Sequence, residues 1–355
     1  MTQPIPIAKR ARFARGAVLA VVLAVTLVVG IVLSAIAGQL PITPTEVIGS
    51  ILRAVGIQNG WAPDDQIIES TLWVVRFPRL VMGLMVGAAL AVAGAVMQAI
   101  FGNPLAEPGV VGVSSGAALG ASVSIVLGLT VLGSWSTAVF AFAGGLLAVL
   151  LVYFVSRASG RTEVVTLLLT GIAINAFGGA GLALLLFVGD TASREQIIFW
   201  QLGSLNGSGW TEVLVVAVVA IIGLGVALMF ARKYDLFSLG ERAARHLGVN
   251  VEVLRVLSIL LVALLTGAAV AFCGIIAFVG LVVPHIIRMA IGPAHRPLIL
   301  ASAVGGGVLM VFADLIARTM IPGADLPIGM LTSLIGGPFF FFLLYRARKQ
   351  SGGWA

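Results

Sequence analysis

Long apolar stretches separated by short polar ones dominate the chain. Eight stretches carry no charged side chain when His285 is counted as neutral, and a helix that crosses a membrane needs about 20 mostly apolar residues. The stretches cover residues 16–45, 80–106, 108–156, 164–189, 213–231, 256–287, 297–313 and 326–345. This pattern predicts an all-α polytopic membrane protein.

Two of the stretches are too long for one crossing. The third contains the turn sequence LGSWS at 132–136, and the sixth is interrupted near CGIIAFVG at 273–280 and continues past Arg288. Six single and two double stretches predict ten transmembrane helices in one domain that covers residues 1–355. An even number of crossings places both termini on the same side.

The basic residues indicate which side that is. Of the 21 lysines and arginines, those on the side opposite the termini are Arg53, Arg76, Arg79, Arg194 and Arg318. Because positive charge gathers on the cytoplasmic side of membrane proteins, both termini are expected in the cytoplasm. Residues 1–15 would form a basic cytoplasmic N-terminus and residues 346–355 a cytoplasmic tail. The net charge of +7 then reflects topology and does not indicate nucleic-acid binding.

The amino-acid composition agrees with a polytopic membrane protein and excludes several kinds of chemistry. The chain is 60% hydrophobic and 10% charged, and its mean hydropathy is +1.13. The lone Cys273 excludes an intrachain disulfide and a cysteine metal site. None of the three lysines follows glycine and precedes serine or threonine, so the chain has no phosphate-binding loop for ATP. We therefore expect no enzyme activity, no cofactor and no metal site.

One cytoplasmic connection, residues 232–255, is longer and more polar than the others. On a helical projection its apolar side chains share one face: Leu239, Ala243 and Leu247. Glu241 and Arg245 can pair at a spacing of four residues, and Gly248 ends the helix. The pattern predicts a short amphipathic helix, which is either a solvated connection or a docking site for a cytoplasmic partner.

Two prolines interrupt the backbone in GNPLAEPG at 102–109. The segment that contains this break, RFPRLVMGLMVGAALAVAGAVMQAIFGNPLAEPGVVGVSSGAALGA at 76–121, closely resembles the FecCD-type permeases of ABC importers. That family includes vitamin B12, heme and ferric siderophore permeases. Further resemblance lies in FWQLGSLNGSGW (199–210), SLGERAARHLGV (238–249) and two segments within 274–344, and it covers nearly all of the chain after residue 70.

The resemblance implies a permease subunit of the bacterial cytoplasmic (inner) membrane. Its implied partners are a second permease copy in a homodimer, two separate ATP-binding subunits, a substrate-binding protein outside the cell, and membrane lipid. The substrate, an iron complex, would pass along the dimer axis. FWQLGSLNGSGW is most similar to heme permeases, so heme is the first choice, with ferric siderophore next and cobalamin third.

The resemblance also implies roles for individual residues. The coupling helix that docks on the ATP-binding subunit would comprise Leu239, Gly240, Glu241, Arg242, Ala243, Arg245, Leu247 and Gly248. The apolar residues would be buried against the ATP-binding subunit, and the charged ones would contact its rim. Arg76, Arg79 and Arg318 would face acidic residues of the binding protein.

The fifth predicted helix is the candidate translocation route, because Thr170 and Asn175 interrupt its apolar sequence. These two polar residues could equally bond within the helix bundle. The loop before this helix, ASGRT at 158–162, aligns with the cytoplasmic gate of the family and contains Gly160 and Thr162.

Parts of the sequence also fit two other classes of function. An ion-coupled secondary transporter needs an ionisable residue within the membrane, and the candidate, Asp314, lies four residues before Arg318 as expected for an ion pair. A serine hydrolase is suggested by GVSSG at 112–116, but small residues at this spacing, Gly112, Gly116 and Gly120, are typical of closely packed membrane helices.

Overall fold

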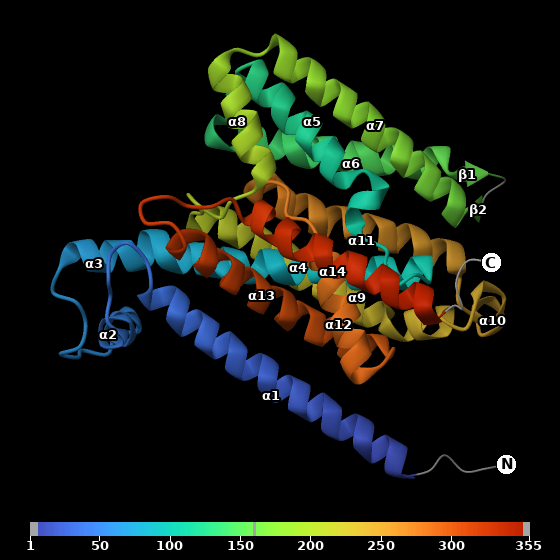
Figure 1. Cartoon of the computed structure of the whole chain (residues 1–355), viewed down its shortest axis with the longest axis horizontal. Helices are drawn as coiled ribbons and strands as arrows, with labels where there is room; N and C mark the ends of the chain where they lie inside the picture. Colours follow the sequence, from blue (N-terminus) through green and yellow to red (C-terminus); the bar gives the residue numbers. More distant parts are fainter. Residues whose placement is uncertain (1–5, 159–160, 351–355) are drawn as a thin grey trace.

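The computed structural model describes residues 6–158 and 161–350, and this part of the chain is almost entirely α-helical (Figure 1). Seven of its helices are long and apolar enough to cross a membrane. They are, or contain, α1 (Pro6–Ile36), α4 (Phe77–Phe101), α6 (Ser136–Val155), α7 (Val164–Val188), α9 (Trp210–Phe237), α11 (Val251–Cys273) and α13 (His295–Thr319). Three further apolar helices are shorter: α5 (Val113–Val126), α12 (Val279–Ile291) and α14 (Ile328–Gln350, apolar to Leu343).

The remaining elements connect these helices. Four are short α-helices: α2 (Pro44–Ala54), α3 (Gln66–Ser70), α8 (Thr191–Leu202) and α10 (Glu241–His246). Others are the π-helical turn η1 (Thr71–Arg76), the 3-10 turns η2 (Pro108–Val111) and η3 (Gly133–Trp135), and a two-stranded antiparallel hairpin of β1 (Arg157–Ala158) and β2 (Arg161–Thr162). The hairpin, α10, the start of α1 and the end of α14 lie at one end of the bundle, called here the terminal end (Figure 1). The end that carries α2 and α3 is called the opposite end.

Both predicted helix breaks within long apolar stretches are confirmed. The turn η3 separates α5 from α6, and five residues separate Cys273, the end of α11, from Val279, the start of α12. A short helix, α2, follows the first crossing. Ten crossings stay a prediction, because α5 and α12 are shorter than a typical span.

Two helices differ in extent from the uncharged stretches that located them. Helix α1 runs from Pro6 to Ile36, whereas the first uncharged stretch covers residues 16–45. The chain leaves α1 before Pro41 and Pro44, which disfavour a continued helix. The second uncharged stretch begins at residue 80, and α3, η1 and α4 follow one another without a break from Gln66 to Phe101.

Helix α4 forms the centre of the bundle and packs against α13, α9, α11 and α12. The backbones touch at glycines. A Cβ atom added to Gly87 would lie 2.1 Å from the carbonyl oxygen of Gly306 in α13, and one added to Gly94 would lie 1.8 Å from that of Gly280 in α12. Such close approach is how helices gain van der Waals contact in lipid, where apolar side chains gain nothing from leaving water.

Helices α5, α6 and α7 form a group at the edge of the bundle (Figure 1). Only 11% of the most apolar part of α7 is buried, compared with 78% in the helix that contains α4. Large apolar side chains of α7 are therefore exposed, among them Ile172, Phe177 and Phe187. This face has no covering element in the described part of the single chain.

Two backbone breaks meet inside the bundle. The N–H of Phe278, just before α12, donates to the carboxylate of Glu107, in the connection between α4 and α5, at 3.0 Å. Phe278 has φ +68, a conformation that a bulky residue rarely adopts, and its ring lies where a side chain at Gly336 of α14 would be. The contact satisfies a backbone group that helix geometry leaves unbonded.

Helix α2 begins with a reciprocal cap. The hydroxyl of Thr43 accepts from the N–H of Glu46 at 3.3 Å, and the Glu46 carboxylate accepts from the N–H of Thr43 at 2.7 Å. The bonds from the backbone N–H and the hydroxyl of Thr43 hold the pKa of Glu46 below its usual value. The carboxylate therefore stays charged at the N-terminus of α2, where the helix dipole favours it.

The glycine contacts of α4 give a test of this packing. We expect Gly94→Ala to destabilise the protein by about 1–3 kcal/mol, because the added methyl group forces α4 and α12 apart. Gly225→Ala in α9 is the matched control, since nothing lies within 4 Å of a Cβ atom there. Thermal unfolding in detergent should show a lower midpoint for Gly94→Ala alone, and equal midpoints for the two variants would contradict the packing described.

Candidate functional site

The predicted coupling helix is α10, which lies at the terminal end between α9 and α11 (Figure 1). It is shorter than the amphipathic pattern suggested, because Gly240 and Gly248 have φ angles of +99 and +84. The N–H of Gly248 donates to the carbonyl of Arg245 at 3.0 Å, so the predicted helix stop at this glycine is confirmed.

The apolar side chains around α10 divide into an inner and an outer set. Ala244 and Val249 are buried against the core of the bundle. Leu239 and Leu247 flank the helix with 64% and 56% of their surface exposed, and Ala243 is half-buried. Two large apolar side chains thus project from the terminal end, where the predicted docking face was placed.

The charged residues of α10 have a more specific arrangement than the sequence indicated. The predicted pair is confirmed, with Arg245 donating to Glu241 at 3.1 Å. Glu241 also accepts from Arg255 of α11, which is 4% exposed and packs over the Phe237 ring at 5.9 Å. The carboxylate predicted to contact a partner's rim is therefore held by two arginines of its own chain. The sequence did not identify Arg255 as a partner of Glu241, because the two residues are fourteen positions apart and lie in different helices.

At the opposite end, three arginines and two aspartates form an internal cluster. Arg79 of α4 donates to Asp314 of α13 at 2.8 Å and to Asp325 at 2.7 Å. Asp314 also lies 3.4 Å from Arg318, so the ion pair expected from their spacing is present. Asp314 is 2% exposed, and its nearer partner is Arg79, which is 235 residues away in sequence.

Arg76 and Arg318 bind the end of α1. Arg76 donates to the carbonyl oxygens of Ala35 and Leu40, and Arg318 donates to those of Ser34 and Ala37. Cationic donors stabilise the last carbonyl groups of a helix, which lack partners within it. These guanidinium groups, which the resemblance assigned to binding-protein docking, bond to groups of their own chain, and the docking role stays a prediction. A polar cavity of about 510 Å³ borders Arg76, Arg79 and Arg318.

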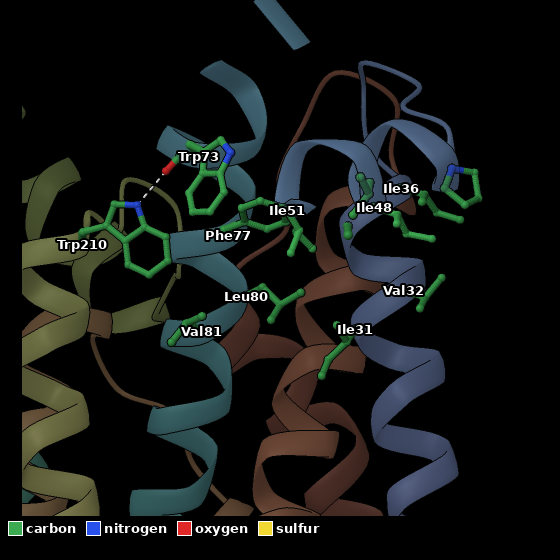
Figure 2. Close-up of a pocket in the computed structure, with 13 residues that line it drawn as sticks. Ile31, Val32, Ile36, Ile48, Ile51, Trp73, Phe77, Leu80, Val81 and Trp210 are labelled. Carbon is green, nitrogen blue, oxygen red and sulfur yellow. Dashed lines mark hydrogen bonds between the residues drawn. The ribbon is translucent and has the colours of Figure 1, made fainter. Parts of the chain in front are cut away.

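A second cavity at the same end is apolar. It has a volume of about 380 Å³ and lies between α1, α2 and the first turns of α4, with Leu80 and Ile31 among its lining residues (Figure 2). The indole N–H of Trp210 donates to the Trp73 carbonyl at 2.7 Å (Figure 2). The indole N–H of Trp73 donates to the Ser50 hydroxyl at 2.8 Å. Tryptophans commonly mark the level of the membrane interface. The cavity contains none of the predicted route residues.

The predicted route residues lie on or beside α7 but do not form one site. Asn175 accepts from the Ser115 hydroxyl at 2.6 Å and donates to the Gly109 carbonyl at 3.4 Å, which is the bundle-bonding role that the sequence also allowed. Thr170 is half-buried five residues earlier. Thr162 pairs with Arg157 in the β1–β2 hairpin, and Gly160 lies outside the described residues.

Two features bear on the alternative chemistries. The described residues contain no group of three or more His, Cys, Asp or Glu side chains that could hold a metal ion. The serine position of the G-x-S-x-G pattern is Ser114, and the hydroxyl of the adjacent Ser115 donates to the Asn175 side-chain oxygen at 2.6 Å. The bond of Ser115 thus joins α5 to α7, which is a packing role and not the serine–base pair of a hydrolase.

Comparison with known proteins accounts for this architecture. The sequence profile of the FecCD transport family matches residues 26–346. The hemin transport system permease protein HmuU of Yersinia pestis is 43% identical over 79% of this chain and 85% of its own length. The cobalamin import system permease protein BtuC of Halobacterium salinarum is 41% identical, covering 83% of this chain and 78% of its own. The Fe(3+)-citrate import system permease protein YfmD of Bacillus subtilis is 39% identical, covering 80% and 83%.

A solved structure agrees with these relatives. It is described as an inward-facing conformation of an ABC transporter of the metal-chelate type, and its chain is 33% identical. The similarity covers 93% of this chain and 99% of that one, with a TM-score of 0.78. The described helices, the apolar spans and the matched profile lead to one conclusion. The chain belongs to the FecCD transport family and is the permease of an ABC importer, a multi-pass protein of the cytoplasmic membrane.

Proposed function

We propose that the chain pairs with a second copy, receives an iron complex from an external binding protein and is driven by two ATP-binding subunits. The terminal end would then face the cytoplasm, and ten helices would cross the membrane. The observation that carries this proposal is the exposure of Leu239 and Leu247 on either side of α10. Two large apolar side chains beside one short polar helix offer apolar surface that a partner can bury.

The second copy would pack against the exposed face of α7. Leu169, Ile172 and Phe177 are exposed on this helix, and Phe341 and Phe342 are exposed on α14. A route along the dimer axis would lie between the two α7 helices, beside Thr170 and the β1–β2 hairpin that forms the proposed gate. Asn175 would support the helix from within the bundle through Ser115.

A secondary transporter is the alternative from another class. Its coupling residue would be Asp314, but this carboxylate lies between Arg79 and Arg318, two fixed positive charges. These two guanidinium groups occupy the carboxylate oxygens that a coupling ion would have to reach. Substrate uptake into vesicles that contain the permease without ATP-binding subunits would support this alternative.

The coupling proposal can be tested at Leu247. We expect Leu247→Asp to lower ATP-driven uptake by about tenfold or more, because burying a large apolar side chain contributes about 1.5–3 kcal/mol at a docking surface. Arg245→Ala is the comparison, since an exposed ion pair contributes about 0–1 kcal/mol. Uptake and ATP hydrolysis would be measured in vesicles reconstituted with all subunits. An equal or larger effect of Arg245→Ala would refute the proposed docking face.

We further propose that Arg76, Arg79 and Arg318 support binding-protein docking from inside the fold, by holding α1, α4 and α13 together. A carboxylate of the binding protein would have to enter the 510 Å³ cavity to reach them. By bonding α1, α4 and α13 to one another, these arginines would fix the position of the surface on which the binding protein docks.

This role gives a distinct expectation for Arg79. Arg79→Ala should destabilise the protein by about 3–5 kcal/mol, because it leaves Asp314 buried with a weaker partner. Asp190→Ala, on the surface of the same end, should change stability far less. Thermal unfolding would be measured together with the salt dependence of binding-protein association. An unchanged unfolding midpoint with slower, salt-sensitive association would show direct docking instead.

Heme is the proposed substrate. FWQLGSLNGSGW (199–210) carries the resemblance, and the hemin permease has the highest identity of the three relatives described. We expect ATP-dependent uptake of heme, followed by its absorbance, in vesicles containing the complete importer. Ferric citrate, a ferric siderophore and cobalamin are the competing substrates to assay alongside it. Uptake of one of these without heme uptake would overturn the assignment.

A further inference from the structure

The end of α9 and the start of α13 meet at the terminal end through Asp235 and His295. One carboxylate oxygen of Asp235 accepts the backbone N–H of His295 at 2.8 Å, and the same oxygen lies 2.7 Å from the ring Nδ1 of His295. Asp235 is 44% exposed at its side chain, whereas His295 is 2% exposed. The histidine ring also packs beside Tyr234, with ring centres 5.7 Å apart.

Helix α13 has no cap of its own. Its N-cap residue is Ala294, which makes no side-chain hydrogen bond, and its first turn contains no acidic residue. The first N–H groups of a helix need acceptors, and negative charge is favourable beside them. Asp235 supplies both from a different helix, so the position of α13 depends on the end of α9.

The same end of α9 leads directly into the proposed docking region. Asp235 precedes Glu241, the first residue of α10, by six positions. Two contacts connect this region to α11: the Tyr234 hydroxyl lies 2.8 Å from that of Ser258, and Glu241 accepts from Arg255. Asp235 adds a connection to α13, which has 25 residues and is therefore about 38 Å long.

Helix α13 is suited to transmit a displacement over that length. Its backbone touches α4 at Gly306, and its far end carries Asp314 and Arg318 of the arginine cluster. A movement of the α9–α10 connection would therefore shift the start of a helix whose other end holds α1 and α4. Packed helices carry such movements as rigid elements.

We infer that Asp235 is a positioning residue that connects the docking region of the ATP-binding subunit to α13. This inference rests on the proposed function, because it takes α10 to be the docking helix from which movement passes to α13. The carboxylate acts through the backbone N–H of His295 and contacts neither ATP nor substrate.

The test compares variants in vesicles that contain the complete importer. We expect Asp235→Ala to lower the substrate transported per ATP hydrolysed by about fivefold to tenfold, since a helix cap and its geometry are lost. Asp235→Asn, which can still accept the His295 N–H, should stay within about twofold of the native ratio. This rescue distinguishes positioning by the hydrogen bond from a general effect of removing charge.

Asp190→Ala is the matched control. Asp190 caps α8 at the opposite end by accepting the N–H of Ser193 at 2.7 Å, and its loss should leave the transport ratio unchanged. If Asp235→Ala gives too little folded complex, Asp235→Glu replaces it. That variant keeps the charge but displaces the carboxylate by one methylene group, and its ratio should fall between those of alanine and asparagine.

A native ratio in Asp235→Ala or Asp235→Glu, or an equal loss in Asp190→Ala, would overturn the inference. Leu247→Asp separates this result from failure of the proposed function. If Leu247→Asp uncouples transport and Asp235→Ala does not, the docking face stands and the α13 connection fails. If both variants keep the native ratio, the docking face itself is wrong.

Discussion

The close contact between α4 and α13 is the interaction on which the other helices depend. Gly87 and Gly306 bring the two backbones together, and this contact places Asp314 of α13 beside Arg79 of α4. The same helix then presents Arg318 to the end of α1, whose apolar part is otherwise only 6% buried within the chain. Without the glycine contact, the buried aspartate and the attachment of α1 would both lose their geometry.

Polar groups in this fold are concentrated where helices begin and end. Arg76 and Arg318 bind the last carbonyl groups of α1, Asp235 binds the first N–H of α13, and Glu241 lies at the start of α10. In a membrane protein the helix ends are where backbone groups lack partners, and unsatisfied groups are costly away from water. Charged side chains thus determine how helices are attached, while apolar side chains and glycines determine how they pack.

The sequence was sufficient for features governed by local composition and insufficient for long-range pairs. The breaks between α5 and α6 and between α11 and α12 follow from turn residues, and the Glu241–Arg245 pair follows from helical spacing. The burial of Arg79 could not be predicted this way, because Asp314 and Asp325 lie more than 230 residues away. A search for uncharged stretches also leaves out the first turns of the second helix, because Arg76 and Arg79 interrupt the apolar sequence there.

The contact between Glu107 and Phe278 has a consequence for how the protein is made. The two residues are 171 positions apart, so Glu107 enters the membrane long before its partner has been synthesised. Until Phe278 is synthesised, the Glu107 carboxylate lacks the N–H donor that it binds in the folded protein. The backbone N–H before α12 likewise needs Glu107 as its acceptor. This contact between the two breaks can therefore form only after the chain has been synthesised beyond Phe278.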